Sequence, residues 1–99
     1  MDGFTKQTGE IFPIQVDFND VLDDGETLVS AGSTVTAYQG TEDVSDEVLD
    51  ANSKTVGSGV VSIKVQAGTD QTRYKLTFSA TTSAGNVYEK DVYMMVRDI

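Results

Sequence analysis

The chain has 99 residues, a length that suits one domain and leaves little room for a second. Sixteen Asp and Glu residues against seven Lys and Arg residues give a formal net charge of -9, and His and Cys are absent. This composition excludes disulfides, cysteine nucleophiles, the Ser-His-Asp triad and metal sites built on His or thiolate ligands. Phosphate backbones and anionic lipid surfaces repel so acidic a chain, so we expect no nucleic acid and no membrane as a partner.

The first nine residues are polar and small apart from Phe4. We predict a flexible N-terminal arm over residues 1–9, followed by one folded domain over residues 10–99. The start of the chain lacks the basic and apolar regions of a secretory signal peptide. Either the protein is used without export or a signal has been removed, and the sequence does not distinguish these two cases.

Residues 11–18 show the first clear strand pattern. Apolar side chains alternate with polar ones, and those on one side are Phe12, Ile14, Val16 and Phe18. This period of two predicts a half-buried strand. Pro13 has no N–H to donate to a neighbouring strand, so this strand lies at a sheet edge or is broken there.

The next predicted elements are shorter. Asp23-Asp24-Gly25 predicts a turn, because glycine tolerates positive φ. We then expect a short strand over residues 27–30, interrupted by Gly32, and another over residues 33–39, which is rich in Thr, Val and Tyr.

Residues 40–52 are ambiguous. Val44, Val48 and Leu49 have helical spacing, but acidic residues crowd both ends of the segment. We predict a short strand near residues 47–51, with a single helical turn as the alternative.

The second half of the chain carries the most regular patterns. We predict strands over residues 61–65, 73–82 and 87–97, with a hairpin loop at residues 83–86. The inward side chains of these strands are Val61, Ile63, Val65, Tyr74, Leu76, Phe78, Ala80, Val92, Met94 and Val96.

About seven short strands are therefore expected, and no segment shows sustained helical periodicity. Strands without intervening helices cannot form a parallel crossover sheet, which leaves an antiparallel sandwich or a small barrel. A single sheet would leave its apolar face in water, although burying each such side chain contributes about 1.5–3 kcal/mol. We therefore predict an all-β fold in which two antiparallel sheets pack face to face.

Charge is unevenly distributed along the chain. Residues 1–50 carry twelve of the sixteen acidic residues and one of the seven basic residues. One interpretation is a set of solvated acidic loops that keep a small domain soluble. The alternative is an electrically polar module whose acidic and basic surfaces meet between copies.

The acidic segment over residues 17–26 suggests calcium binding but does not fit an EF-hand loop. With Gly25 at the sixth position, the third ligand position falls on Leu22 and the twelfth on Ala31, neither of which can bind calcium through its side chain. A solvated turn is the favoured interpretation, and a loose calcium site shared between loops is the alternative. No glycine-rich phosphate motif is present, and nothing predicts burial of the paired carboxylates, so we expect no enzyme activity and no cofactor.

Exposed aromatic residues can mark protein contacts. Tyr38, Tyr88 and Tyr93 are candidates, and Met95 shares a face of the last strand with Tyr93. Tyr93 and Met95 could form a docking patch. The alternative is that these side chains cover a second apolar layer or pack under the N-terminal arm.

The segment from Thr72 to Thr81, followed by Ser83-Ala84-Gly85-Asn86 and the last strand, resembles the final hairpin of immunoglobulin-like sandwiches. Tyr74 matches the tyrosine corner at the start of the penultimate strand in that family. The cysteine pair and the buried tryptophan of antibody domains are absent. The resemblance is therefore to the cysteine-free bacterial and viral immunoglobulin-like modules, and it implies a sandwich of about seven strands.

A second resemblance rests on the order of several short motifs along residues 11–97. These are Val16-Asp17-Phe18, Leu22, Gly25-Glu26-Thr27-Leu28, Ser30, Tyr74-Lys75-Leu76-Thr77 and Thr82-Ser83-Ala84-Gly85-Asn86. The order resembles that of small tailed-bacteriophage and prophage virion proteins of the fibre-tail adaptor type. It implies a non-enzymatic structural module of the tail or neck, made in the bacterial host cytoplasm and assembled into the virion. Its implied partners are other virion or tail proteins, with a homo-oligomer as a further possibility in the assembled particle.

The residues that we expect to make protein contacts are Asp20, Asp23, Asp24 and Glu26 in the acidic loop, with Tyr93 and Met95 on the last strand. The N-terminal arm is a third candidate, ordering on binding. An alternative function is that of an extracellular bacterial immunoglobulin-like module for adhesion or carbohydrate binding. The absence of Trp, the best ring for stacking on sugars, counts against this alternative.

Overall fold

The computed structural model describes residues 3–99, and these residues contain eight strands, one short α-helix and one 3-10 turn. The strands are β1 (Gly3–Lys6), β2 (Phe12–Asp17), β3 (Leu28–Gln39), β4 (Glu42–Asp43), β5 (Leu49–Gly57), β6 (Val60–Val65), β7 (Thr72–Thr82) and β8 (Val87–Val96). The 3-10 turn η1 covers Asn19–Val21, and the helix α1 covers Ser45–Val48. Within the described part of the chain, no helix is long and apolar enough to span a bilayer.

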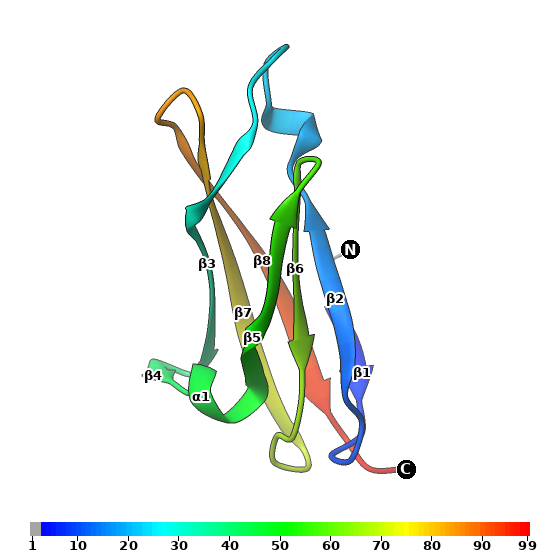
Figure 1. The fold of residues 1–99 in the computed structure, drawn as a ribbon. Coiled ribbons are helices and arrows are strands. Elements are labelled where there is room, and N and C mark those ends of the chain that lie inside the picture. The colour runs from blue at the N-terminus through cyan, green and yellow to red at the C-terminus, as the bar shows by residue number, and fades with distance from the viewer. Residues whose placement is uncertain (1–2) are drawn as a thin grey trace.

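The strands form two sheets that face each other along the length of the molecule (Figure 1). One sheet has five strands in the order β1-β8-β7-β3-β4, and the other has three in the order β2-β6-β5. β1 pairs with β8 in parallel, whereas the other paired strands are antiparallel. The predicted all-β sandwich is confirmed, and its strand order is compatible with an immunoglobulin-like arrangement.

The core lies between the two sheets, where alternate side chains of each strand meet. Four apolar inward residues of β7 are completely buried: Tyr74, Leu76, Phe78 and Ala80. They are joined by Val92, Met94 and Val96 of β8, by Val61, Ile63 and Val65 of β6, and by Ile14 and Val16 of β2. These are the residues that the period-two patterns predict for the core, because a pleated strand turns alternate side chains to opposite faces.

The strand that contains Pro13 lies at an edge, as its sequence predicts. β2 is the outer strand of the three-stranded sheet, and Pro13 pairs with Lys64 of β6 on its inner side. Phe12 of this strand meets Phe4 of β1 edge to face, with ring centroids 5.8 Å apart. This contact closes one long side of the sandwich between the two sheets.

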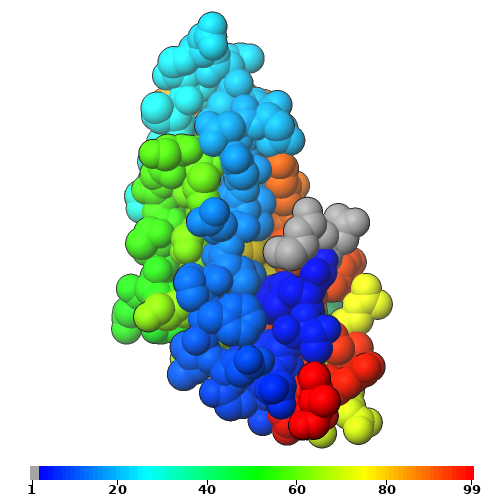
Figure 2. Space-filling model, turned by 90° about the vertical axis from the view of Figure 1, so that its right-hand side faces the viewer, coloured from blue at the N-terminus to red at the C-terminus, as the bar shows by residue number. Residues whose placement is uncertain are grey.

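The prediction of a flexible arm over residues 1–9 is wrong for Gly3–Lys6, which form β1 alongside β8. The Lys6 side chain is fully buried, and its Nζ donates hydrogen bonds to the carbonyl oxygens of Gln7 and Ala67, at 2.7 and 2.6 Å. Beyond the strand, Thr8 donates its backbone N–H to Asp98 at 2.9 Å. Figure 2 shows this N-terminal segment lying against the C-terminal end of the chain. Residues 1 and 2 of the expected arm lie outside the described residues.

Two expected strands, over residues 27–30 and 33–39, are joined in the continuous strand β3. Gly32 disturbs the pairing with β7 rather than ending the strand, because the register shifts between Val29 and Thr34. A Cβ atom at Gly32 would lie 2.8 Å from the Thr81 side chain, so the close approach of the two strands requires glycine here.

The ambiguous segment over residues 40–52 contains the short strand β4 and the single helical turn α1. Asp43 fixes the start of this turn, since its Oδ1 accepts hydrogen bonds from the Ser45 hydroxyl at 2.6 Å and backbone N–H at 3.0 Å. The predicted strand at residues 47–51 begins too early, because Val48 still belongs to α1 and β5 starts at Leu49. The alternative of one helical turn is confirmed.

Candidate functional site

The acidic loop over residues 19–26 forms one tip of the molecule, next to the β7–β8 hairpin (Figure 1). Asp20 makes an ion pair with Lys90 of β8, with 2.6 Å between Oδ1 and Nζ. The Lys90 ammonium also donates to the Asp17 carbonyl at 2.9 Å and lies 5.3 Å from the centroid of the Phe18 ring. The hydrogen bond from Lys90 and its positive charge lower the pKa of the Asp20 carboxyl.

The other acidic residues of this loop differ in their contacts. Glu26 accepts a hydrogen bond from the Asp23 backbone N–H at 2.9 Å and another from the Asn86 amide at 3.2 Å. The pKa of Glu26 is lowered by hydrogen bonds with the Asp23 backbone, the Thr82 side chain and the Asn86 side chain, in that order of size. The bond with Asn86 also connects the loop to the hairpin. Asp24 makes no hydrogen bond or ion pair within residues 3–99. The Asp23 carboxylate has no such partner in this part of the chain either, since only the Asp23 backbone is hydrogen-bonded, so the loop charges most available to a partner are those of Asp23 and Asp24.

Tyr93 and Met95 lie on the outer face of the five-stranded sheet, on the side away from the core. Tyr93 is 37% exposed, and Met95 is half-buried. The strand register places Tyr93 in one row that crosses all five strands, and this row consists of Gly3, Tyr93, Lys75, Tyr38 and Asp43. The outer face around Tyr93 thus includes residues of β3 and β7 as well as β8.

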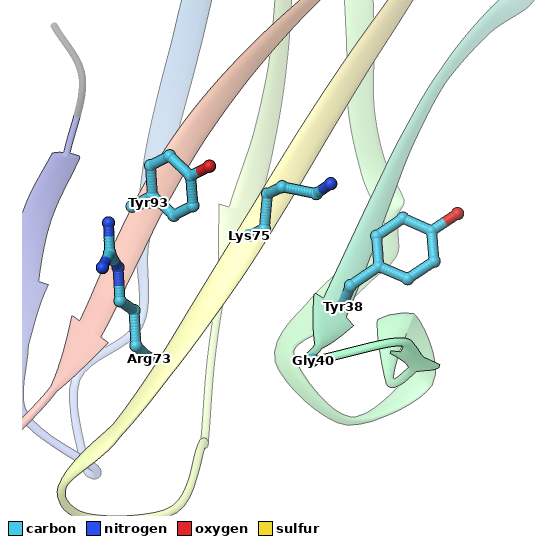
Figure 3. A pocket seen from close by; sticks show the side chains of 5 residues that line it. All are labelled: Tyr38, Gly40, Arg73, Lys75 and Tyr93. Atoms are coloured by element: carbon cyan, nitrogen blue, oxygen red, sulfur yellow. The ribbon is translucent and has the colours of Figure 1, made fainter.

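Cations and aromatic rings alternate on this face (Figure 3). The Arg73 guanidinium lies 4.3 Å from the centroid of the Tyr93 ring, and the Lys75 ammonium lies 5.7 Å from the centroid of the Tyr38 ring. With Gly40, these side chains line an open hollow of about 300 Å³. We call this group of five residues the basic-aromatic hollow.

The structure does not bring the two sets of predicted contact residues together. The acidic loop lies beside the hairpin at residues 83–86, whereas Tyr93 pairs with Gly3 and Lys75, well along β8 from that hairpin. Sequence reasoning named Tyr38 and Tyr93 as aromatic candidates but missed Arg73 and Lys75. The signal was present, since both cations occupy outward positions of the most regular strand in the chain.

The third tyrosine candidate, Tyr88, turns inward. It is half-buried and packs against the core, so it does not add to the outer face. Tyr74 is also internal and completely buried, at the start of β7. Its hydroxyl accepts a hydrogen bond from the backbone N–H of Thr69 at 2.9 Å, which joins the strand to the preceding loop. This is the contact that a tyrosine corner makes.

The described residues contain no group of three or more Asp and Glu side chains placed to hold a metal ion. The Asp20 carboxylate instead accepts a hydrogen bond from Lys90, and the Glu26 carboxylate accepts hydrogen bonds from Asp23 and Asn86. The chemistry that the two surfaces offer is recognition through charge, hydrogen bonds and ring faces.

Comparison with protein families identifies the relatives of this chain. Residues 6–95 match the model of the family described as podophage GP4 fiber-tail adaptor protein gp77. The chain belongs to this family. No curated protein matches it. Because the match extends from the last residue of β1 to the end region of β8, it includes both the acidic loop and all five residues of the basic-aromatic hollow.

Membership in the adaptor family assigns the chain a structural adaptor role in a phage and makes it a component of the virion. The resemblance to fibre-tail adaptor proteins that the order of motifs indicates is thereby confirmed.

Proposed function

We propose that this adaptor is a non-enzymatic module of the phage tail or neck that works through direct protein–protein contacts. The single observation that carries the proposal is the family match over residues 6–95. The fold that we propose is immunoglobulin-like, supported by the strand order β1-β8-β7-β3-β4 against β2-β6-β5 and by the Tyr74 hydroxyl contact with Thr69.

A fibre-tail adaptor needs at least two contact surfaces, since it joins two other components. The acidic loop with Asp20, Asp23, Asp24 and Glu26 supplies one candidate, and the face with Tyr93 and Met95 supplies the other. Their separation along an elongated molecule, 44 Å in its longest dimension, supports this division because two partners can bind without competing for space.

We further propose that the protein is made in the host cytoplasm, and that its partners are virion proteins rather than nucleic acid or membrane. The net charge of -9 supports both exclusions, since like charges repel. Contact between copies in the assembled particle is compatible with the same surfaces.

Sedimentation of the protein with separate tail, neck and fibre components tests this proposal. We expect it to co-sediment with at least one of them, and to do so less well at high salt because charged surfaces are involved. A protein that stays free in the presence of every virion component would overturn the proposal. Binding to glycans instead would favour the adhesion module.

A further inference from the structure

The basic-aromatic hollow concentrates positive charge on a chain that has little of it. Only seven basic residues are present, and Lys6 is buried while Lys90 is paired with Asp20. Arg73 and Lys75 instead lie against aromatic rings, and within residues 3–99 neither has a carboxylate within 4.0 Å. A cation over a ring keeps its N–H groups free to donate, so both side chains are positioned for a further acceptor.

The acidic residues nearest in the strand register are engaged elsewhere. Asp43, at the end of the row, accepts hydrogen bonds from Ser45, and these lower the pKa of its carboxyl. Asp91 accepts a hydrogen bond from the Thr77 hydroxyl at 2.9 Å. Thr77 follows Lys75 by two residues and lies on the same face of β7. These contacts hold the neighbouring carboxylates in place and leave the two cations facing solvent across the hollow.

We propose that the basic-aromatic hollow binds an acidic, extended segment of a partner protein. Carboxylates of the segment would accept hydrogen bonds from Arg73 and Lys75, and its carbon chain would pack beside the rings of Tyr38 and Tyr93 rather than on the ring faces that the two cations occupy. The rest of the surface is mostly acidic and repels such a segment. Electrostatic attraction to Arg73 and Lys75 therefore favours binding of the segment at this face and fixes its orientation.

An acidic peptide fits these features better than the other ligands that aromatic rings attract. A single-stranded nucleic acid could stack on the tyrosines, but it carries a phosphate at every nucleotide and would extend this charge beyond the hollow over a chain of net charge -9, whereas a protein segment can confine its carboxylates to the hollow. A sugar ring would need the open face of an aromatic side chain, and the guanidinium of Arg73 already covers Tyr93 at 4.3 Å.

This inference rests on the proposed adaptor function and names the site and chemistry of one of its contacts. The test is a titration of the full chain with a hexaglutamate peptide, followed by backbone amide NMR shifts. We expect the largest shifts at residues 38–40, 73–75 and 93, with binding that weakens as salt rises. Shifts spread evenly over the surface, or no shifts at all, would overturn the inference.

Three variants sharpen the titration. Arg73→Gln and Lys75→Gln each remove one charged donor, and we expect each to weaken peptide binding about tenfold. Lys64→Gln is the matched control, because Lys64 is an exposed lysine on β6 of the other sheet, and we expect its affinity to stay unchanged. Equal loss in all three variants would contradict a local site. Unchanged thermal midpoints show that the variants remain folded.

Parallel arms of the experiment separate the alternatives. Tighter binding of a single-stranded oligonucleotide than of hexaglutamate would replace the inference with a nucleic-acid site. Concentration-dependent dimers that Arg73→Gln abolishes would replace it with a contact between copies. If tail components bind both variants as well as they bind the unaltered chain, the adaptor function stands and the hollow is not its site. If hexaglutamate binds but no virion protein does, the adaptor function fails while the site remains.

Discussion

The buried hydroxyl of Tyr74 accepts a hydrogen bond from the backbone N–H of Thr69, with 2.9 Å between oxygen and nitrogen. This bond anchors the loop between β6 and β7, in which Ala67, Gly68 and Gln71 all have positive φ. The loop also carries the Ala67 carbonyl that accepts from the buried Lys6 ammonium at 2.6 Å. One tyrosine thus helps to connect the two sheets and the first strand.

Replacing Tyr74 with Phe tests this connection. Tyr74→Phe keeps the ring in the core but leaves the Thr69 N–H without its partner, so we expect a loss of about 1–3 kcal/mol in the free energy of unfolding. Urea denaturation measures the change. Tyr88→Phe is the control, because the Tyr88 hydroxyl has no hydrogen-bond partner within residues 3–99, and we expect less than about 0.5 kcal/mol there. Equal losses of stability in the two variants would show that the Tyr74 hydrogen bond does not account for the loss.

Two glycines of the β5–β6 hairpin give a second matched pair. Gly59 has φ of 77°, and a Cβ atom there would overlap the Asn19 amide, which donates to the Ser58 carbonyl at 3.0 Å. We expect Gly59→Ala to lose about 1–3 kcal/mol of stability. Gly57 has open space around its Cβ position, so Gly57→Ala should change stability by less than about 1 kcal/mol. Thermal unfolding of both variants measures the difference, and similar midpoints would contradict the geometry.

The docking of β1 can be tested at Gly3. A Cβ atom at this position would lie 2.9 Å from the Tyr93 carbonyl oxygen, so Gly3→Ala should loosen the pairing of β1 with β8. The readout is hydrogen exchange at the Arg97 N–H, which donates to the Lys6 carbonyl at 2.8 Å. We expect protection to fall about tenfold. Gly9→Ala, which has no atom near its Cβ position, should leave protection unchanged; a similar fall there would contradict the prediction.

Stability should decrease in acid because of three carboxyls whose pKa is lowered in the folded state. Hydrogen bonds lower the pKa of Asp20 and Asp43 from 3.8 and that of Glu26 from 4.5. At pH values above the unfolded-state pKa values, the ionised carboxyls contribute their full stabilisation to the folded state. The benefit is lost as pH falls through the lowered pKa values, so the free energy of unfolding should drop below about pH 4.

The Asp20→Asn variant checks this explanation. It removes the charge that pairs with Lys90, so the acid-induced loss of stability should become shallower than in the unaltered chain. Asp24→Asn is the control, because the Asp24 carboxylate makes no hydrogen bond or ion pair in the described structure. Denaturant unfolding between neutral pH and strong acid measures how steeply the free energy of unfolding falls with pH in each variant. A shallower curve for Asp24→Asn alone would contradict the assignment.

Local sequence patterns predict the central strands well because burial on one face imposes a period of two. Residues 73–82 show this period, and the structure turns Leu76 and Phe78 inward as expected. β1 lacks the pattern: Phe4 is its one large apolar residue, and its pairing depends on β8, some 90 residues away in the chain. Burial of Lys6 cannot be predicted locally either, because the carbonyls that accept its hydrogen bonds come from a turn and a distant loop.

The candidate site shows the same division between local and long-range information. An exposed Tyr93 follows from alternation along β8, but its neighbours Lys75 and Tyr38 depend on the register of three strands. The sequence places Lys75 on the solvent side of its strand without indicating a ring beside it. The ambiguity of segment 40–52 has a different reason: the valine spacing alone does not indicate the contact in which Asp43 accepts hydrogen bonds from Ser45 at the start of the helical turn.

The most direct test of the adaptor function measures whether the chain joins tail and fibre. Purified phage tails lacking this protein are mixed with purified fibres and sedimented, with and without the chain. We predict that fibres co-sediment with tails only when the chain is present. Fibres that attach equally well in its absence, or that stay free in its presence, would contradict the account.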